Sequence, residues 1–64
     1  MEYSLMEWYG KYLVVKTDPN GARLYLRGIA RSVLCWYHDP LYARPFTLRT
    51  ALKHLMELRA GQTD

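Results

Sequence analysis

One hairpin signal constrains this chain most, because two alternating runs, residues 11–17 and 22–27, flank a tetrapeptide suited to a tight turn. In that tetrapeptide, Asp18–Gly21, the ring of Pro19 presets φ for the first corner of a type I turn. Gly21 suits the left-handed position that closes a bulged hairpin. The pattern therefore predicts two antiparallel strands joined by this turn.

The register of this hairpin decides which side chains share a face of the sheet. We expect an apolar face that meets the rest of the core, made by Leu13, Val15, Leu24 and Leu26. We expect the other face to be basic and aromatic, made by Tyr12, Lys16, Arg23, Tyr25 and Arg27. Since no other predicted element covers this second face, its five residues are the candidate partner-binding site.

Two further elements follow the hairpin. Residues 32–38 are apolar, with β-branched and aromatic side chains, and predict a third strand that ends before Pro40. Residues 47–60 predict a helix with Thr47 as its N-cap, closed by Gly61 in a left-handed conformation. At 100° per residue the apolar side chains of this helix fall in one broad arc. They are Leu48, Ala51, Leu52, Leu55, Met56 and Leu58.

The predicted fold class is α+β, a three-stranded antiparallel meander with one C-terminal helix packed on one face. Residues 1–64 form a single small domain, with the sheet over 11–38 and the helix over 47–60. Residues 1–10 fit neither the helical nor the strand period, and we interpret them as an N-terminal arm or an early start of the first strand.

Composition limits how such a chain is stabilised. A domain of 64 residues buries only about 60% of its unfolded surface, and one cysteine, Cys35, forms no internal disulfide. Nine aromatic residues are many for so small a core, so we expect a homodimer. The single thiol, and the absence of a basic leader or long apolar run, favour a soluble cytosolic protein without membrane contact.

The residue pattern offers no catalytic or metal-binding constellation. Cys35 and His38, three apart on a predicted strand, point to opposite faces. His38–Asp39 has no nucleophile to act on, because Ser4 and Ser32 lack the flanking glycines of a nucleophile elbow. The six acidic residues are scattered and pair into neither a glycosidase dyad nor a magnesium cluster. We expect a chain that is not an enzyme and takes no cofactor or metal.

A face of tyrosines and cations leaves three roles open. It binds acidic protein surfaces, since Tyr and Arg dominate protein hot spots. It binds single-stranded nucleic acid by stacking and phosphate contact, which a net charge of +3 permits. It is also compatible with a solvated sheet face or a dimer interface.

The chain resembles short accessory proteins of phages and mobile elements, over residues 11–60. The matching positions are Tyr25-Leu-Arg-Gly28, Trp36, Asp39, Ala43, Phe46-Thr47, Ala51, Leu52 and Leu55. The resemblance implies a strand–strand–strand–helix fold without catalytic residues. It also implies an anti-CRISPR-like inhibitor, which binds a host defence complex stoichiometrically in the host cytoplasm.

Overall fold

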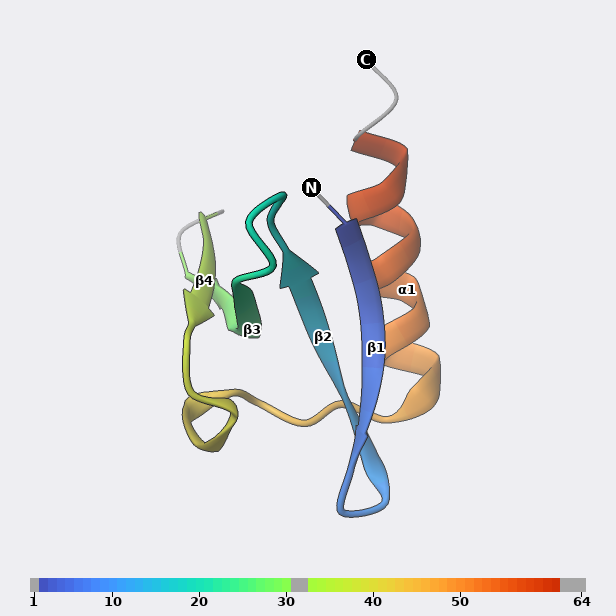
Figure 1. Cartoon of the computed structure of the whole chain (residues 1–64). Coiled ribbons are helices and arrows are strands. Elements are labelled where there is room, and N and C mark those ends of the chain that lie inside the picture. The colour runs from blue at the N-terminus through green and yellow to red at the C-terminus, as the bar shows by residue number, and fades with distance from the viewer. Residues whose placement is uncertain (1, 31–32, 62–64) are drawn as a thin grey trace.

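The computed structural model describes residues 2–30 and 33–61, which form a four-stranded sheet and a C-terminal helix (Figure 1). The elements are β1 Glu2–Trp8, β2 Lys11–Thr17, β3 Arg23–Ala30, β4 Val33–Tyr37, the 3₁₀ turn η1 Pro40–Tyr42, and α1 Leu48–Ala60. The strands follow one another in the sheet in the order β1-β2-β3-β4, and each neighbouring pair is antiparallel. The expected α+β class with an antiparallel sheet and one C-terminal helix is confirmed.

The sheet has four strands, and the expectation of three is wrong. Residues 2–8 pair with β2 along their full length, from Glu2 opposite Thr17 to Trp8 opposite Lys11. The connection is a two-residue turn in which Tyr9 has φ 49° and Gly10 has φ 81°. Two-residue hairpin loops of this hand need positive φ at both central positions. Tyrosine rarely takes that conformation, so Gly10 is the only residue of this pair that indicates such a turn in the sequence.

The turn between β2 and β3 has the predicted chemistry but not the predicted register. Gly21 takes φ 87°, and its amide donates to the Asp18 carbonyl at 2.9 Å. The Asp18 amide in turn donates to the Ala22 carbonyl at 3.0 Å. The loop that this pair closes therefore has three residues, 19–21, where the expected pairing of the strands needs two. Val15 therefore lies opposite Tyr25, and the expected pairing of Val15 with the Leu24 face is wrong. A shift of one residue exchanges the two faces of β3 relative to β2.

Both faces of the sheet consequently carry a core. Val14, Leu26 and Ala51 are buried between the sheet and α1. Leu13 and Val15 are buried with Tyr25 on the opposite face. The second core is closed by partly buried Met6, Trp8 and Ala43. The prediction of a single apolar face is therefore wrong: Leu13 and Val15 lie on one face of the sheet, and Leu24 and Leu26 lie on the helix side.

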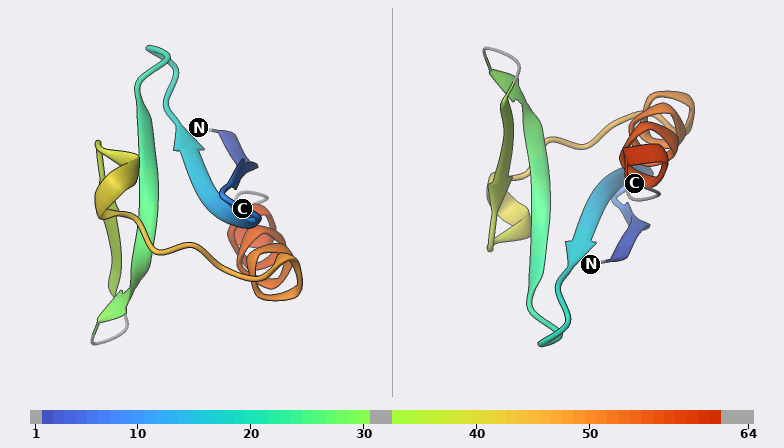
Figure 2. Two further views of the ribbon diagram at one scale, coloured as in Figure 1. Left: turned by 90° about the horizontal axis from the view of Figure 1, so that it is seen from below. Right: turned by 90° about the horizontal axis from the view of Figure 1, so that it is seen from above.

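Direct backbone pairing between β2 and β3 is short and lies next to the Asp18–Ala22 turn. The β2–β3 register covers residues 15–17 and 23–25, and farther along, segment 44–46 bridges the two strands. The Arg44 amide donates to the Leu26 carbonyl at 3.3 Å. Phe46 exchanges two backbone hydrogen bonds with Tyr12, at 2.8 and 2.9 Å. Figure 2 shows this segment crossing from the β3–β4 hairpin to the helix.

Helix α1 begins as predicted, with the Thr47 hydroxyl accepting from the Thr50 amide at 3.4 Å. Its cap at Gly61 has φ −70°, so the predicted left-handed stop is wrong. Only Ala51 and Leu55 of the apolar arc are buried. The side chains of Leu48, Leu52 and Met56 are exposed instead.

Strand β3 runs past its predicted end at residue 27. The backbone continues through Gly28 to Ala30, with a register shift that leaves Arg27 opposite no residue of β4. Such irregularities bend a strand and redirect a side chain. The predicted start of the next strand, residue 32, lies outside the described residues, and β4 is described from Val33.

Candidate partner-binding site

The five residues predicted to share one face lie in two environments. Tyr12 is half-buried on the helix side, against the cluster of Val14, Leu26 and Ala51. Lys16 pairs with Leu24 on the same side, and its ammonium lies over the Trp36 ring. The prediction of one continuous surface containing Tyr12 and Lys16 is therefore wrong.

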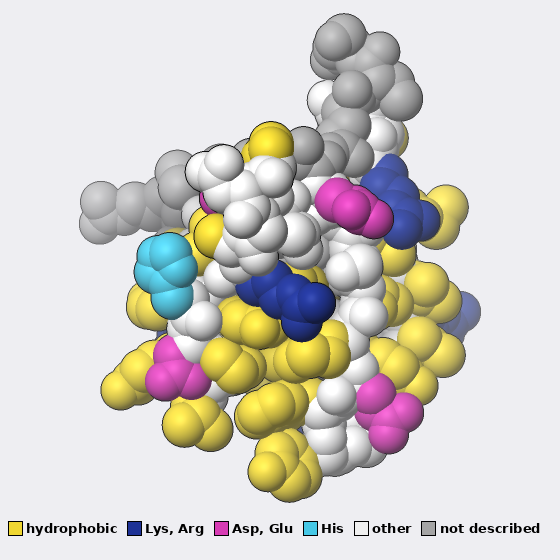
Figure 3. Space-filling view, viewed as in Figure 1, with side chains coloured by type: hydrophobic (Ala, Val, Ile, Leu, Met, Phe, Trp, Pro, Cys, Tyr) yellow, Lys and Arg dark blue, Asp and Glu magenta, His cyan; other side chains and the backbone are white. Residues whose placement is uncertain are grey.

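The other three predicted residues belong to the face turned away from α1. Tyr25 is only 8% exposed and is part of the second core, so its ring offers little surface to a partner. Arg23 and Arg27 are exposed. Figure 3 shows hydrophobic side chains gathered across the surface turned to the viewer, with a Lys or Arg side chain among them. Figure 3 also shows Asp or Glu side chains on this surface, which is therefore largely apolar with charges of both signs. Of the predicted basic and aromatic face, Arg23 and Arg27 are the exposed cations found here.

The structure brings four side chains together at one end of this face. We refer to Arg27, Tyr37, Tyr42 and Arg44 as the Arg27 cluster. The Arg27 guanidinium donates from Nη1 to the Tyr42 carbonyl at 2.9 Å, and its Cζ lies 5.9 Å from the centroid of the Tyr37 ring. The Tyr37 and Tyr42 ring centroids are 6.3 Å apart. Arg44 is included because it lines the same hollow as Arg27.

Local sequence explains why these four residues meet. The register shift of β3 leaves the Arg27 side chain outside the cross-strand pattern. After β4, Asp39 caps η1 by accepting from the Leu41 amide at 2.9 Å, and Pro40 occupies the first turn. The cap turns the chain back so that Tyr42 reaches β3.

A hollow of about 390 Å³ adjoins the cluster, lined by Arg27, Ala43, Arg44 and Pro45. Within the described residues, the Arg44 guanidinium makes no ion pair or hydrogen bond. The Arg27 guanidinium has a carbonyl and a ring as partners, and neither neutralises its charge. Two uncompensated cations beside a hollow favour an anionic group there.

Tyr37, Tyr42 and Arg44 are not among the five residues predicted from the sequence. Tyr37 lies near the end of the predicted strand 32–38, and the other two lie between that strand and the predicted helix 47–60. The available signal was Asp39–Pro40, a pair that favours a capped turn and therefore a return of the chain toward the sheet.

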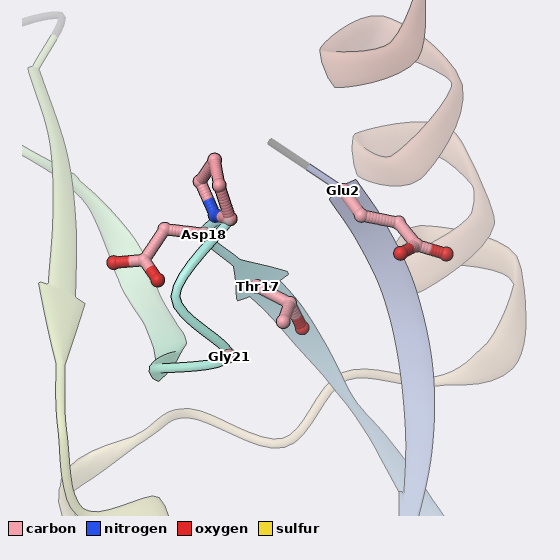
Figure 4. Close-up of a pocket in the computed structure, with 5 residues that line it drawn as sticks. Glu2, Thr17, Asp18 and Gly21 are labelled. Atoms are coloured by element: carbon pink, nitrogen blue, oxygen red, sulfur yellow. The ribbon is translucent and has the colours of Figure 1, made fainter.

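A second hollow lies between the start of β1 and the β2–β3 turn, with a volume of about 600 Å³. It is lined by Glu2, Thr17, Asp18, Pro19 and Gly21 (Figure 4). The carboxylates of Glu2 and Asp18 point away from each other, and Asp18 already accepts from the Ala22 amide at 3.1 Å. This hollow does not bring two carboxylates onto one ligand.

Other reactive side chains are apart from one another. Cys35 is half-buried and His38 is exposed, while the His54 ring lies 5.0 Å from the Phe46 ring. Across residues 2–30 and 33–61, no three His, Cys, Asp or Glu side chains are grouped to hold a metal ion. In the same residues, no helix has the length and hydropathy of a membrane span.

Comparison with known proteins finds no matching family model, no matching curated protein and no matching solved structure. The resemblance to phage and mobile-element accessory proteins accordingly stays a prediction. Any function rests on the geometry of the site.

Proposed function

We propose that this protein is a non-catalytic binding module that docks the Arg27 cluster on an acidic protein surface. The observation that carries the proposal is the pairing of two uncompensated guanidinium groups, on Arg27 and Arg44, with two exposed tyrosine rings. Guanidinium groups match carboxylates in a bidentate geometry. Tyrosine and arginine are also the residues that contribute most to protein hot spots.

The cluster is partly ordered before any partner arrives. Arg27 is held by the Tyr42 carbonyl and lies against the Tyr37 ring, so docking immobilises few additional rotamers of this side chain. Each rotamer-rich side chain ordered on binding costs about 0.5–1.5 kcal/mol. Preorganisation of this kind supports a role in recognition.

The finer assignment is a phage or mobile-element inhibitor of a host defence complex, acting by stoichiometric binding. Its support is the resemblance of residues 11–60 to such accessory proteins. A small inhibitor of this kind works by occupying a surface that the complex needs for its own contacts.

The test is affinity capture from host lysate with the tagged full chain, in parallel arms with and without nuclease. The variant Arg27→Glu/Arg44→Glu reverses both cations of the cluster. The matched control, Arg49→Glu/Lys53→Glu, makes the same charge change at exposed positions of α1. We expect one complex that survives nuclease and is lost only with the cluster variant. Equal capture by both variants contradicts the proposal.

A second candidate is direct binding of single-stranded nucleic acid. It is favoured by the two rings 6.3 Å apart beside a guanidinium, because bases stack on aromatic rings while cations contact phosphates. Anisotropy of a fluorescent oligothymidine distinguishes the candidates. Affinity that falls steeply with salt, and falls again in Tyr42→Ala, supports nucleic-acid binding. No change in anisotropy at about 20 mM salt rejects it.

A further inference from the structure

The two edge strands of the sheet differ in their protection. At the β1 edge, Nη2 of Arg59 donates to the Tyr3 carbonyl at 3.1 Å, and the strand carries the charges of Glu2 and Glu7. At the β4 edge, the sequence Val-Leu-Cys-Trp-Tyr has no charge and no proline. Natural proteins block open edges with charges, prolines or covering segments. An edge strand without these features is therefore open to pairing with a strand of another chain. Figure 1 shows β4 on the outer side of the sheet.

The backbone of β4 offers a defined set of groups to a new strand. The Leu26 carbonyl accepts from Arg44 and therefore points away from β4. Leu26 lies opposite Trp36, so these two residues form a non-hydrogen-bonded pair. The amide and carbonyl of Trp36 consequently point outward, and by alternation those of Leu34 do too.

From these features we infer that a second copy of this chain pairs with β4 in antiparallel fashion, about a two-fold axis at Cys35. Leu34 then lies opposite Trp36 of the second copy, and the outward groups of both form hydrogen-bonded pairs. Cys35 lies opposite its own copy in a non-hydrogen-bonded pair, with Cα atoms about 4.5 Å apart. No charge opposes a like charge anywhere in this pairing, so β4 is its own complement.

The pairing has a consequence for the Arg27 cluster. A two-fold axis through an antiparallel pair of strands stands perpendicular to the sheet, so both copies keep the same face on the same side. The two Arg27 clusters then face one partner together. Two linked sites bind with an effective concentration that raises affinity without any new contact. The pairing itself does not depend on the function proposed for the cluster.

The experiment is sedimentation of the full chain over a range of concentrations, combined with oxidation of Cys35. We expect the mass to rise from the 7.6 kDa of one chain to twice that value. The oxidant is diamide, which accepts the two thiol hydrogens as the Cys35 side chains of the two copies form a disulfide. The expected distance of about 4.5 Å between the two Cys35 Cα atoms permits this bond. We expect a single disulfide-linked dimer, which Cys35→Ser abolishes. A mass of 7.6 kDa up to about 1 mM overturns the inference.

A synthetic chain with an N-methylated Leu34 amide separates this edge from other surfaces. The methyl group removes one outward donor without changing a side chain, and we expect a monomer. The matched control is N-methylation of Tyr3, whose carbonyl and amide face outward at the other edge. We expect that chain to remain dimeric. A dimer that survives N-methylation of Leu34 and does not cross-link through Cys35 overturns the inference.

Discussion

The ammonium nitrogen of Lys16 lies 4.5 Å from the centroid of the Trp36 ring, which joins β2 to β4 across the intervening strand. The Tyr3 ring lies 6.1 Å from the same indole, so the two edge strands also approach each other on this side. Lys16 is therefore a structural cation on the helix side of the sheet and not part of the open basic face.

Lys16→Met keeps the length of the side chain and removes its charge. We expect the free energy of unfolding to fall by about 0.5–2 kcal/mol, because a partly desolvated cation–π contact is lost. Urea unfolding followed by circular dichroism measures the change. Lys53→Met, at an exposed position of α1, is the control and is expected to alter stability by less than about 0.5 kcal/mol. Equal effects of the two substitutions contradict a role for the Trp36 contact.

Leu13 and Leu26 are both 0% exposed but belong to cores on opposite faces of the sheet. Truncation of a fully buried leucine costs about 2–5 kcal/mol. That cost is comparable to the whole stability of so small a domain, about 0.05–0.15 kcal/mol per residue. We expect Leu13→Ala and Leu26→Ala each to abolish cooperative thermal unfolding. Leu41→Ala, at a position 75% exposed, is the control. A chain that tolerates one of the two core substitutions has only one essential core.

Tyr9 holds φ 49° in the β1–β2 turn although its ring is 91% exposed. Asn tolerates this conformation better than tyrosine, and Asn-Gly is the favoured pair for such a turn. We expect Tyr9→Asn to stabilise the chain by about 0.5–1 kcal/mol and to raise the midpoint of thermal unfolding. Gly10→Ala, at φ 81°, is expected to lower it. An unchanged midpoint in Tyr9→Asn means that the edge-to-face contact of Tyr9 with Trp8 offsets the strain.

Arg27 anchors η1 through the Tyr42 carbonyl, so its removal is expected to loosen that turn. In Arg27→Ala the Ala43 amide, which donates to the Pro40 carbonyl at 3.1 Å, should exchange with solvent faster. A net loss of about 1 kcal/mol corresponds to roughly fivefold faster exchange by local opening. Hydrogen exchange followed by NMR measures the rate. The control Arg49→Ala, on α1, is expected to leave the exchange rate of the Ala43 amide unchanged. An unchanged rate in Arg27→Ala would contradict a role for Arg27 in holding η1.

Local signals made part of this fold predictable. The φ preference of Pro19 and the freedom of Gly21 specify the β2–β3 turn within four residues, and Thr47 specifies the start of α1. Because position 9 is a tyrosine and not a typical turn residue, the hairpin that makes β1 a separate strand could not be predicted from the sequence. Strand β1 forms because β2 supplies a complete row of backbone partners, which no local pattern in residues 1–10 reports.

The turn, the helix and the α+β class were predictable from short stretches of sequence, because each depends on neighbouring residues. Which side chains share a face depends instead on how the strands pair, because one extra residue in a turn moves Tyr25 opposite Val15 and exchanges the faces of β3. The Arg27 cluster likewise joins residues 27, 37, 42 and 44 through a register shift and a capped turn. Contacts between distant segments follow from the packing of the whole chain, and no short pattern encodes them.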